Sequence, residues 1–203
     1  MLQLGTLKQH FMQYKFLYLF IFILFFIGFL IGGFYANTVS YADFEVAKSN
    51  ADLFISSAKR SSLDYRLILW EDLTPYLWLF LCGLVLLGFP GILYFLFQRG
   101  FSTGFFLSFL IKAFSMKGLF LACFFLVCEV LFFLPALILL TAGATRINLF
   151  SLRSTLHTYR MKQSLKSELL YYLFAFLFSV SLVALGGITK YFFLPPLCSY
   201  LFV

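Results

Sequence analysis

The sequence predicts an all-α, polytopic integral membrane protein with about five transmembrane helices, broken or short helices in the middle, and one extracytoplasmic amphipathic helix. Long apolar, Phe-rich blocks recur at the length of about twenty residues that a helix needs to cross a bilayer. Charged residues make up 11% of the chain and hydrophobic residues 63%, whereas a soluble domain is about a quarter charged. The 203 residues therefore leave room for one integral membrane domain, residues 1–203, and no separate soluble one.

The predicted spans follow from the positions of the apolar blocks. The third block is too short to cross comfortably as a straight helix, so it is either a short span in a thinned bilayer or a re-entrant hairpin. A re-entrant hairpin would leave the long fourth block unable to return the chain to the cytoplasm, and this favours five crossings. The expected spans are residues 16–35, 76–97, 101–114, 118–144 and 169–189.

Glycine and proline occur at intervals within these blocks. The first block is longer than the h-region of about 7–15 residues in a signal peptide, so we expect a retained membrane anchor. Its Gly28 and Gly32 form a G-x-x-x-G pattern, which lets two helix backbones approach closely, although glycine is also common in membrane helices without that role. Further positions are expected to break or pack helices, namely Pro90, Gly100, Gly104 and Pro135.

Residues 37–74 form the one sizeable polar segment and are predicted to lie outside the cytoplasm. Ser40 and Asp43 have the spacing of a helix cap. Apolar residues then recur every three or four positions, which indicates an amphipathic helix. This helix would lie on the membrane surface or against a partner, or it would merely connect two spans. The hypothetical partner surface is Phe44, Ala51 and Phe54.

The distribution of Lys and Arg predicts the orientation. Residues 146–167 are one-sidedly basic and belong in the cytoplasm, and Lys8 and Lys15 favour a cytoplasmic N-terminus. Five spans then place the C-terminus outside, and Arg99 on the cytoplasmic side. The basic surplus is explained by orientation, so no nucleic-acid partner is expected. The basic segment is predicted to bind anionic membrane lipid, with docking of a cytoplasmic ATPase as the alternative.

Glu129 is the one acidic residue inside a predicted span. A charge at that depth costs about 2.5–3.5 kcal/mol by insertion scales, so Glu129 should be neutral, paired or facing a wet cavity. With Arg99 it would form an intramembrane polar hub or ion path, or a packing interaction that holds the bundle together. The candidate partners are Arg99, Lys112, Ser102, Thr103 and Ser108.

No hydrolase constellation is found in the sequence. The letters G-x-S-x-G occur at Gly100–Gly104, but no histidine lies near that serine, and the sequence contains no H-E-x-x-H and no phosphate-binding G-x-x-x-x-G-K-[ST]. His10 and His157 are isolated, and the four cysteines form no C-x-x-C pair. The cysteines are expected to be buried free thiols. We therefore expect no catalytic residues, no metal and no cofactor.

The order of several local motifs resembles the stage II sporulation protein M family. A basic N-terminus enters a span that ends in glycines, an amphipathic segment follows, and a long helix carries a proline and then a run of small residues. The likeness covers nearly the whole chain. The motifs are Gly28–Gly33, Gly83–Pro90, Arg99–Phe105, Lys117–Leu119, Leu134–Ala136 and Thr141–Ala144. Family members often carry Pro-Gln-Asn where this chain has Cys128-Glu129-Val130, which puts any specific role at that site in doubt.

The resemblance implies a five-span scaffold without enzymatic activity in the bacterial cytoplasmic membrane. In sporulating bacteria the family member helps to place two peptidoglycan-degrading partners, stage II sporulation proteins D and P, at the septal membrane during engulfment. Cell-wall hydrolases of the amidase and lytic transglycosylase classes are therefore the expected partners. The alternative is a permease-like subunit of an export system energised by a separate ATPase. A small secondary transporter is disfavoured because no inverted repeat is detectable.

Overall fold

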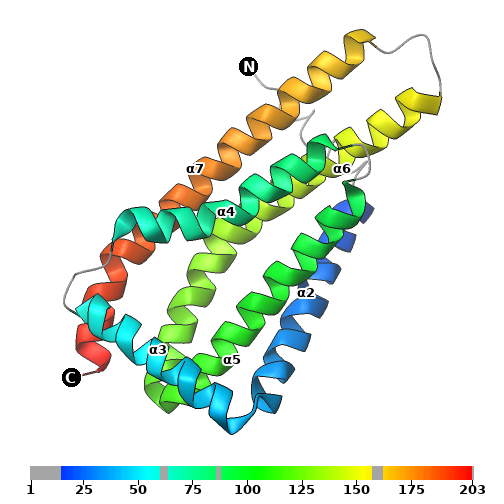
Figure 1. The fold of residues 1–203 in the computed structure, drawn as a ribbon. Helices are drawn as coiled ribbons and strands as arrows, with labels where there is room; N and C mark the ends of the chain where they lie inside the picture. The colour runs from blue at the N-terminus through cyan, green and yellow to red at the C-terminus, as the bar shows by residue number, and fades with distance from the viewer. Residues whose placement is uncertain (1–14, 60–63, 86–87, 157–161, 203) are drawn as a thin grey trace.

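The computed structural model describes residues 15–59, 64–85, 88–156 and 162–202, and within these ranges the secondary structure is entirely helical. The chain order of the helices is shown in Figure 1. They are α2 (Lys15–Thr38), α3 (Tyr41–Lys59), α4 (Tyr65–Leu84), α5 (Phe89–Cys128), the π-helical turn η1 (Glu129–Phe133), α6 (Leu134–Leu156) and α7 (Lys162–Leu201).

Four helical stretches in the described part of the chain are long and apolar enough to cross a membrane. Many of their large apolar side chains are exposed on the outside of the bundle, as in Phe20, Phe26 and Leu30 of α2 or Phe174 and Leu177 of α7. A lipid environment accepts such side chains, whereas water does not. The predicted all-α, multi-pass membrane architecture is confirmed.

The longest stretch, Phe89–Asn148 with 60 residues, is a hairpin of two antiparallel limbs. It reverses at Ser115, whose φ of 51° and ψ of −125° are not helical. The two limbs contact each other through residues that lie progressively farther from Ser115 in the sequence. The ring centroids of Phe106 and Phe125 are 5.1 Å apart, and farther along the limbs Arg99 pairs with Glu129. Figure 1 shows the first limb descending and the second returning beside it.

With the hairpin counted as two limbs, the described chain passes five times along the bundle. Residues 89–114 form the first limb, so the predicted short span 101–114 is only its second half. The sequence interpretation placed the start of this span too late, because it continued the preceding span through Gly88 and Pro90. In the structure α4 ends at Leu84, and Pro90 lies in the first turn of α5, where a missing N–H costs nothing.

Three further boundaries differ from the sequence prediction. Helix α4 begins at Tyr65, capped by the Asp64 side chain, so the second part of the predicted extracytoplasmic segment 37–74 belongs to the bundle. The break expected at Pro135 lies one turn earlier, in η1, where the Leu134 N–H bonds to the Glu129 carbonyl. Helix α7 extends well beyond the predicted span 169–189, because its end packs on α3 through Leu194 and Cys198.

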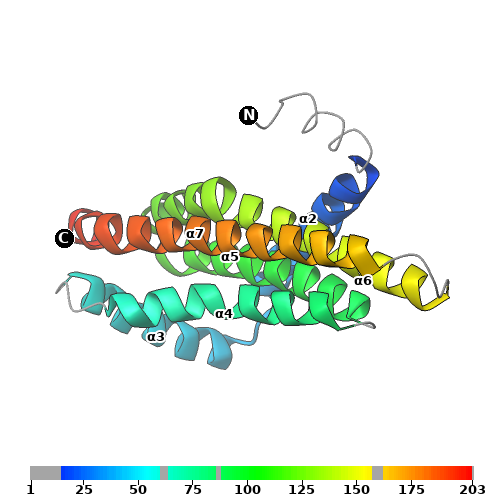
Figure 2. The same ribbon diagram turned by 90° about the horizontal axis from the view of Figure 1, so that it is seen from above.

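Helix α3 lies across the end of the bundle that holds the hairpin reversal and the end of α7 (Figures 1 and 2). The predicted cap is confirmed, since the Asp43 N–H donates to Ser40 Oγ at 3.3 Å. Ile55 and Ala58 are buried in a cluster with residues of α5 and α7. The helix is thus held against the bundle rather than suspended as a loose connection.

Candidate functional site

Four glycines form the contact between α2 and the first limb of α5, which we call the glycine seam: Gly28, Gly32, Gly100 and Gly104. A Cβ atom on any of them would collide with a backbone carbonyl oxygen of the facing helix. Gly28 and Gly32 face Phe97 and Phe101, whereas Gly100 and Gly104 face Phe25 and Phe29. The contacts advance together along both helices, so the two helices run parallel. The two G-x-x-x-G patterns therefore face each other, which is the packing that such patterns permit.

Arg99 and Glu129 meet between the two limbs of the hairpin. Arg99 Nε lies 3.0 Å from Glu129 Oε1, and Nη2 lies 2.9 Å from Oε2. This bidentate geometry is the strongest form of an ion pair in proteins. Thr103 Oγ1 donates to the Arg99 carbonyl at 2.9 Å and lies 3.4 Å from Glu129 Oε1. The structure thus places Arg99 within the bundle, not at the cytoplasmic boundary where the sequence interpretation put it.

The other candidate partners of Glu129 lie elsewhere. Lys112 Nζ bonds to the Ala36 carbonyl at 3.3 Å and sits 4.8 Å from the centre of the Phe44 ring. Ser108 faces Gly33 of α2. Ser102 is exposed on the outer side of α5. Of the five residues proposed from the sequence, the structure brings Arg99 and Thr103 to the carboxylate.

A second ion pair, which the sequence interpretation missed, joins Asp72 of α4 to Lys190 of α7. Lys190 Nζ lies 2.9 Å from both carboxylate oxygens of Asp72. The two residues were assigned to flanks outside the spans. A signal in the sequence could have placed both residues inside helices. It is the apolar run beyond each predicted span end, Leu67–Trp70 before Asp72 and Tyr191–Leu194 after Lys190.

The fully buried Phe133 ring connects the two ion pairs. Lys190 Nζ lies 4.1 Å from its centre, and the Arg99 guanidinium carbon lies 5.3 Å from it. Both are cation–π distances. The Phe133 carbonyl also accepts a hydrogen bond from Tyr76 Oη at 2.9 Å. We call the four charged residues, Asp72, Arg99, Glu129 and Lys190, the polar centre. Its formal charges cancel, which is the condition for holding charge in a low-dielectric interior.

The π-helical turn explains how Glu129 and Phe133 reach this place together. A π-turn inserts one extra residue into a helix and often occurs at functional positions. Both Glu129 and Phe133 are buried, while Val130 and Leu131 between them are exposed to the outside of the bundle. Pro135, the second residue of α6, lacks the N–H that a regular α-helix would use here. The local sequence thus turns the acid and the ring to the same interior face.

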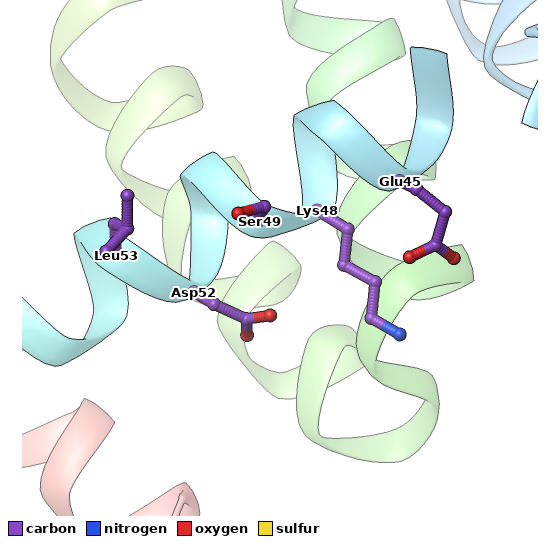
Figure 3. A pocket seen from close by; sticks show the side chains of 5 residues that line it. All are labelled: Glu45, Lys48, Ser49, Asp52 and Leu53. Carbon is purple, nitrogen blue, oxygen red and sulfur yellow. The ribbon is translucent and has the colours of Figure 1, made fainter. Parts of the chain in front are cut away.

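The three residues of the predicted partner surface on α3 do not lie on one exposed face. Phe44 packs against the bundle, with its ring 5.5 Å from that of Phe109, and Ala51 is half-buried. Phe54 is exposed. The outward face of α3 instead presents exposed Tyr41, Val46 and Leu53. A shallow hollow of about 360 Å³ lies beside them, and Figure 3 shows its lining residues. These are Glu45, Lys48, Ser49, Asp52 and Leu53.

Cysteine and metal chemistry give no further site in the part of the chain that the structure describes. Cys128 and Cys198 are buried as expected, whereas Cys82 is half-buried and Cys123 is exposed. No group of three His, Cys, Asp or Glu residues that could hold a metal ion occurs among the described residues. The basic segment 146–167 extends over residues 157–161, which lie outside the described residues, as does Lys8.

Comparisons with known proteins were made for the whole chain. No curated protein and no solved structure matches it. One family model, stage II sporulation protein M, matches residues 21–192. That range begins inside α2 and ends inside α7, so it includes the glycine seam, the hairpin, the π-turn and the polar centre. The chain belongs to the stage II sporulation protein M family, and it is a multi-pass membrane protein of a kind associated with sporulation.

Proposed function

We propose that this protein is a non-enzymatic membrane scaffold that recruits and localises peptidoglycan-remodelling enzymes, as in septal wall thinning and engulfment during sporulation. The observation that carries the proposal is the position of α3. This helix lies across one end of the bundle, is fastened there by Ile55 and Ala58, and keeps a mixed apolar and charged face outward. A helix fastened in this way is a rigid platform for a partner, because little ordering entropy is lost on binding.

The proposal places α3 outside the cell, with the N-terminus in the cytoplasm and the C-terminus outside. Five passes along the bundle put the start of α2 and the end of α7 at opposite ends (Figure 1), as this orientation requires. In a cysteine-free background, an Asn50→Cys variant should react with an impermeant maleimide from outside, and a Thr155→Cys variant should be protected. The reverse pattern would overturn the orientation.

Photo-crosslinking in native membranes tests the recruitment. A photoreactive amino acid replaces Leu53 on the outer face of α3, and the control replaces Leu177, a leucine of α7 that is also exposed. We expect an amidase or lytic transglycosylase to be captured at position 53 and not at position 177. Capture of a cytoplasmic ATPase at other positions, with no wall enzyme at position 53, would favour the permease alternative and defeat the scaffold proposal.

A further inference from the structure

A groove of about 400 Å³ lies between α4 and the first limb of α5. It is lined by Thr74, Pro75 and Trp78 of α4 and by Phe95, Gln98, Arg99 and Ser102 of α5. Thr74 and Ser102 are near the middle of their helices, so the groove opens at mid-membrane depth. Four of the seven lining residues are polar, which is unusual for a surface that faces hydrocarbon.

Several of the polar groups in the groove lack partners. Gln98 and Ser102 are exposed, and neither side chain makes a hydrogen bond with a residue that the structure describes. Glu129 occupies Nε and Nη2 of Arg99, and Nη1 makes no hydrogen bond within the described chain. Pro75 has no N–H to offer the Glu71 carbonyl one turn earlier. Unsatisfied groups of this kind cost several kcal/mol each in a bilayer core, because no water replaces the missing partner.

We infer that the groove binds a transmembrane helix of a partner protein that carries an amide or carboxyl side chain near its middle. An oxygen of that side chain would accept from Arg99 Nη1 and from the Gln98 amide, which within the described chain are unpaired donors in the groove. A lipid acyl chain would fill the space but leave these donors unpaired. Interhelical hydrogen bonds between polar side chains are a recognised driving force for helix association in membranes.

The inference deepens the proposed scaffold function and rests on it for the identity of the partner: the bound helix would be the membrane anchor of a recruited enzyme. The wall enzyme would then be held at two places, by its anchor in the groove and by its outer part on α3. Two linked contacts strengthen binding beyond either one, provided that both can be made at once.

A model helix tests the groove without any wall enzyme. The full-length protein, with a fluorescent acceptor on the exposed thiol of Cys123, is reconstituted into phosphatidylcholine–phosphatidylglycerol vesicles. The probes are donor-labelled poly-leucine helices with either glutamine or leucine at the central position. We expect the glutamine helix to bind about ten-fold more tightly than the leucine helix. Equal binding of the two probes would overturn the inference.

Variants identify the groove as the binding site. Gln98→Leu combined with Ser102→Ala should abolish the preference for the glutamine helix, and Ser102→Trp should block binding by filling the groove. The control is Ser181→Ala, because Ser181 is exposed on α7 but already bonded to the Leu177 carbonyl at 3.0 Å. If binding survives both groove variants, the site is wrong. If the same variants instead abolish association between two copies of the chain, the occupant is a second copy and the partner-helix inference fails.

A failed probe experiment would leave the crosslinking at Leu53 unaffected, and so the recruitment on α3 would stand without the groove. Conversely, a wall enzyme absent from Leu53 would defeat the scaffold proposal while a selective glutamine helix would still establish the groove as an intramembrane binding site. The two proposals can therefore fail separately.

Discussion

The glycine seam and the polar centre hold the same α5 helix in opposite ways. On one side, Gly100 and Gly104 bring the α2 backbone into direct contact, and no charge is involved. On the other side, Arg99 reaches across the hairpin to Glu129, and Lys190 reaches from α7 to Asp72. Lipid chains are as apolar as leucine, so apolar burial does not drive helices together in a bilayer. Close approach of backbones and pairing of polar groups are the two remaining means, and this protein uses each on a separate face.

The largest effect is expected from a side chain introduced into the seam. Gly32→Leu places a branched side chain where even a Cβ meets the Phe101 carbonyl, so α2 must separate from α5. We expect a loss of at least about 3 kcal/mol in the free energy of unfolding. The control is Gly187→Ala, whose added Cβ would lie at an ordinary 3.6 Å from Leu69 Cδ1.

Thermal unfolding in detergent measures this change through native thiols. Cys128 and Cys198 are buried and react with a maleimide dye only on unfolding, and a background with Cys82→Ser and Cys123→Ser removes the half-buried and the exposed thiol. If Gly32→Leu unfolds at the same temperature as Gly187→Ala, the close backbone contact does not hold the two helices.

The next largest effect is expected when one partner of the Arg99–Glu129 ion pair is removed. Glu129→Leu leaves the Arg99 cation unpaired in the interior, and we expect a loss of about 3–5 kcal/mol. The double variant Arg99→Leu with Glu129→Leu should recover most of that loss, because a well-packed apolar pair replaces a buried ion pair without penalty. The same thiol assay measures both. A double variant as unstable as Glu129→Leu would mean that the pair itself, and not the orphaned charge, determines stability.

A smaller effect is expected at the second ion pair. Lys190→Met keeps the length of the side chain and removes its charge, which leaves Asp72 without a partner. Asp72 lies in the first half of α4, closer to an end of the bundle than Glu129, so water reaches it more easily. We expect a loss of about 1–3 kcal/mol, smaller than for Glu129→Leu. An equal loss would place both pairs at the same effective depth.

The smallest effect is expected from a neutral hydrogen bond in the same region. Tyr76→Phe removes the bond from Tyr76 Oη to the Phe133 carbonyl and leaves the ring in place. The expected loss is about 1 kcal/mol, typical of one hydrogen bond between membrane helices. Comparison of this variant with Lys190→Met separates the contribution of charge from that of hydrogen bonding. A larger loss for Tyr76→Phe would assign the strength of the polar centre to its hydrogen bonds.

Much of the fold was predictable because a bilayer imposes simple rules. The apolar blocks predicted membrane helices, the order of the local motifs indicated the family, and the G-x-x-x-G pattern of Gly28 and Gly32 indicated a possible close contact. Helix ends were harder to place. Gly88, Pro90 and Gly91 look the same in a sequence whether they kink one helix or separate two, and the choice moved Arg99 from the cytoplasmic side into the bundle. The same error kept Asp72 outside the membrane and hid its pairing with Lys190.

The sequence by itself determined that this chain is a multi-pass helical membrane protein of the stage II sporulation protein M family, because the length and polarity of each block are local properties. Only the tertiary structure decided which polar groups meet. Arg99 and Glu129 are thirty residues apart, and Asp72 and Lys190 are 118 apart. Their pairing depends on the reversal at Ser115, the extra residue of the π-turn and the antiparallel packing of α4 on α7. These are arrangements between helices, which no local pattern encodes.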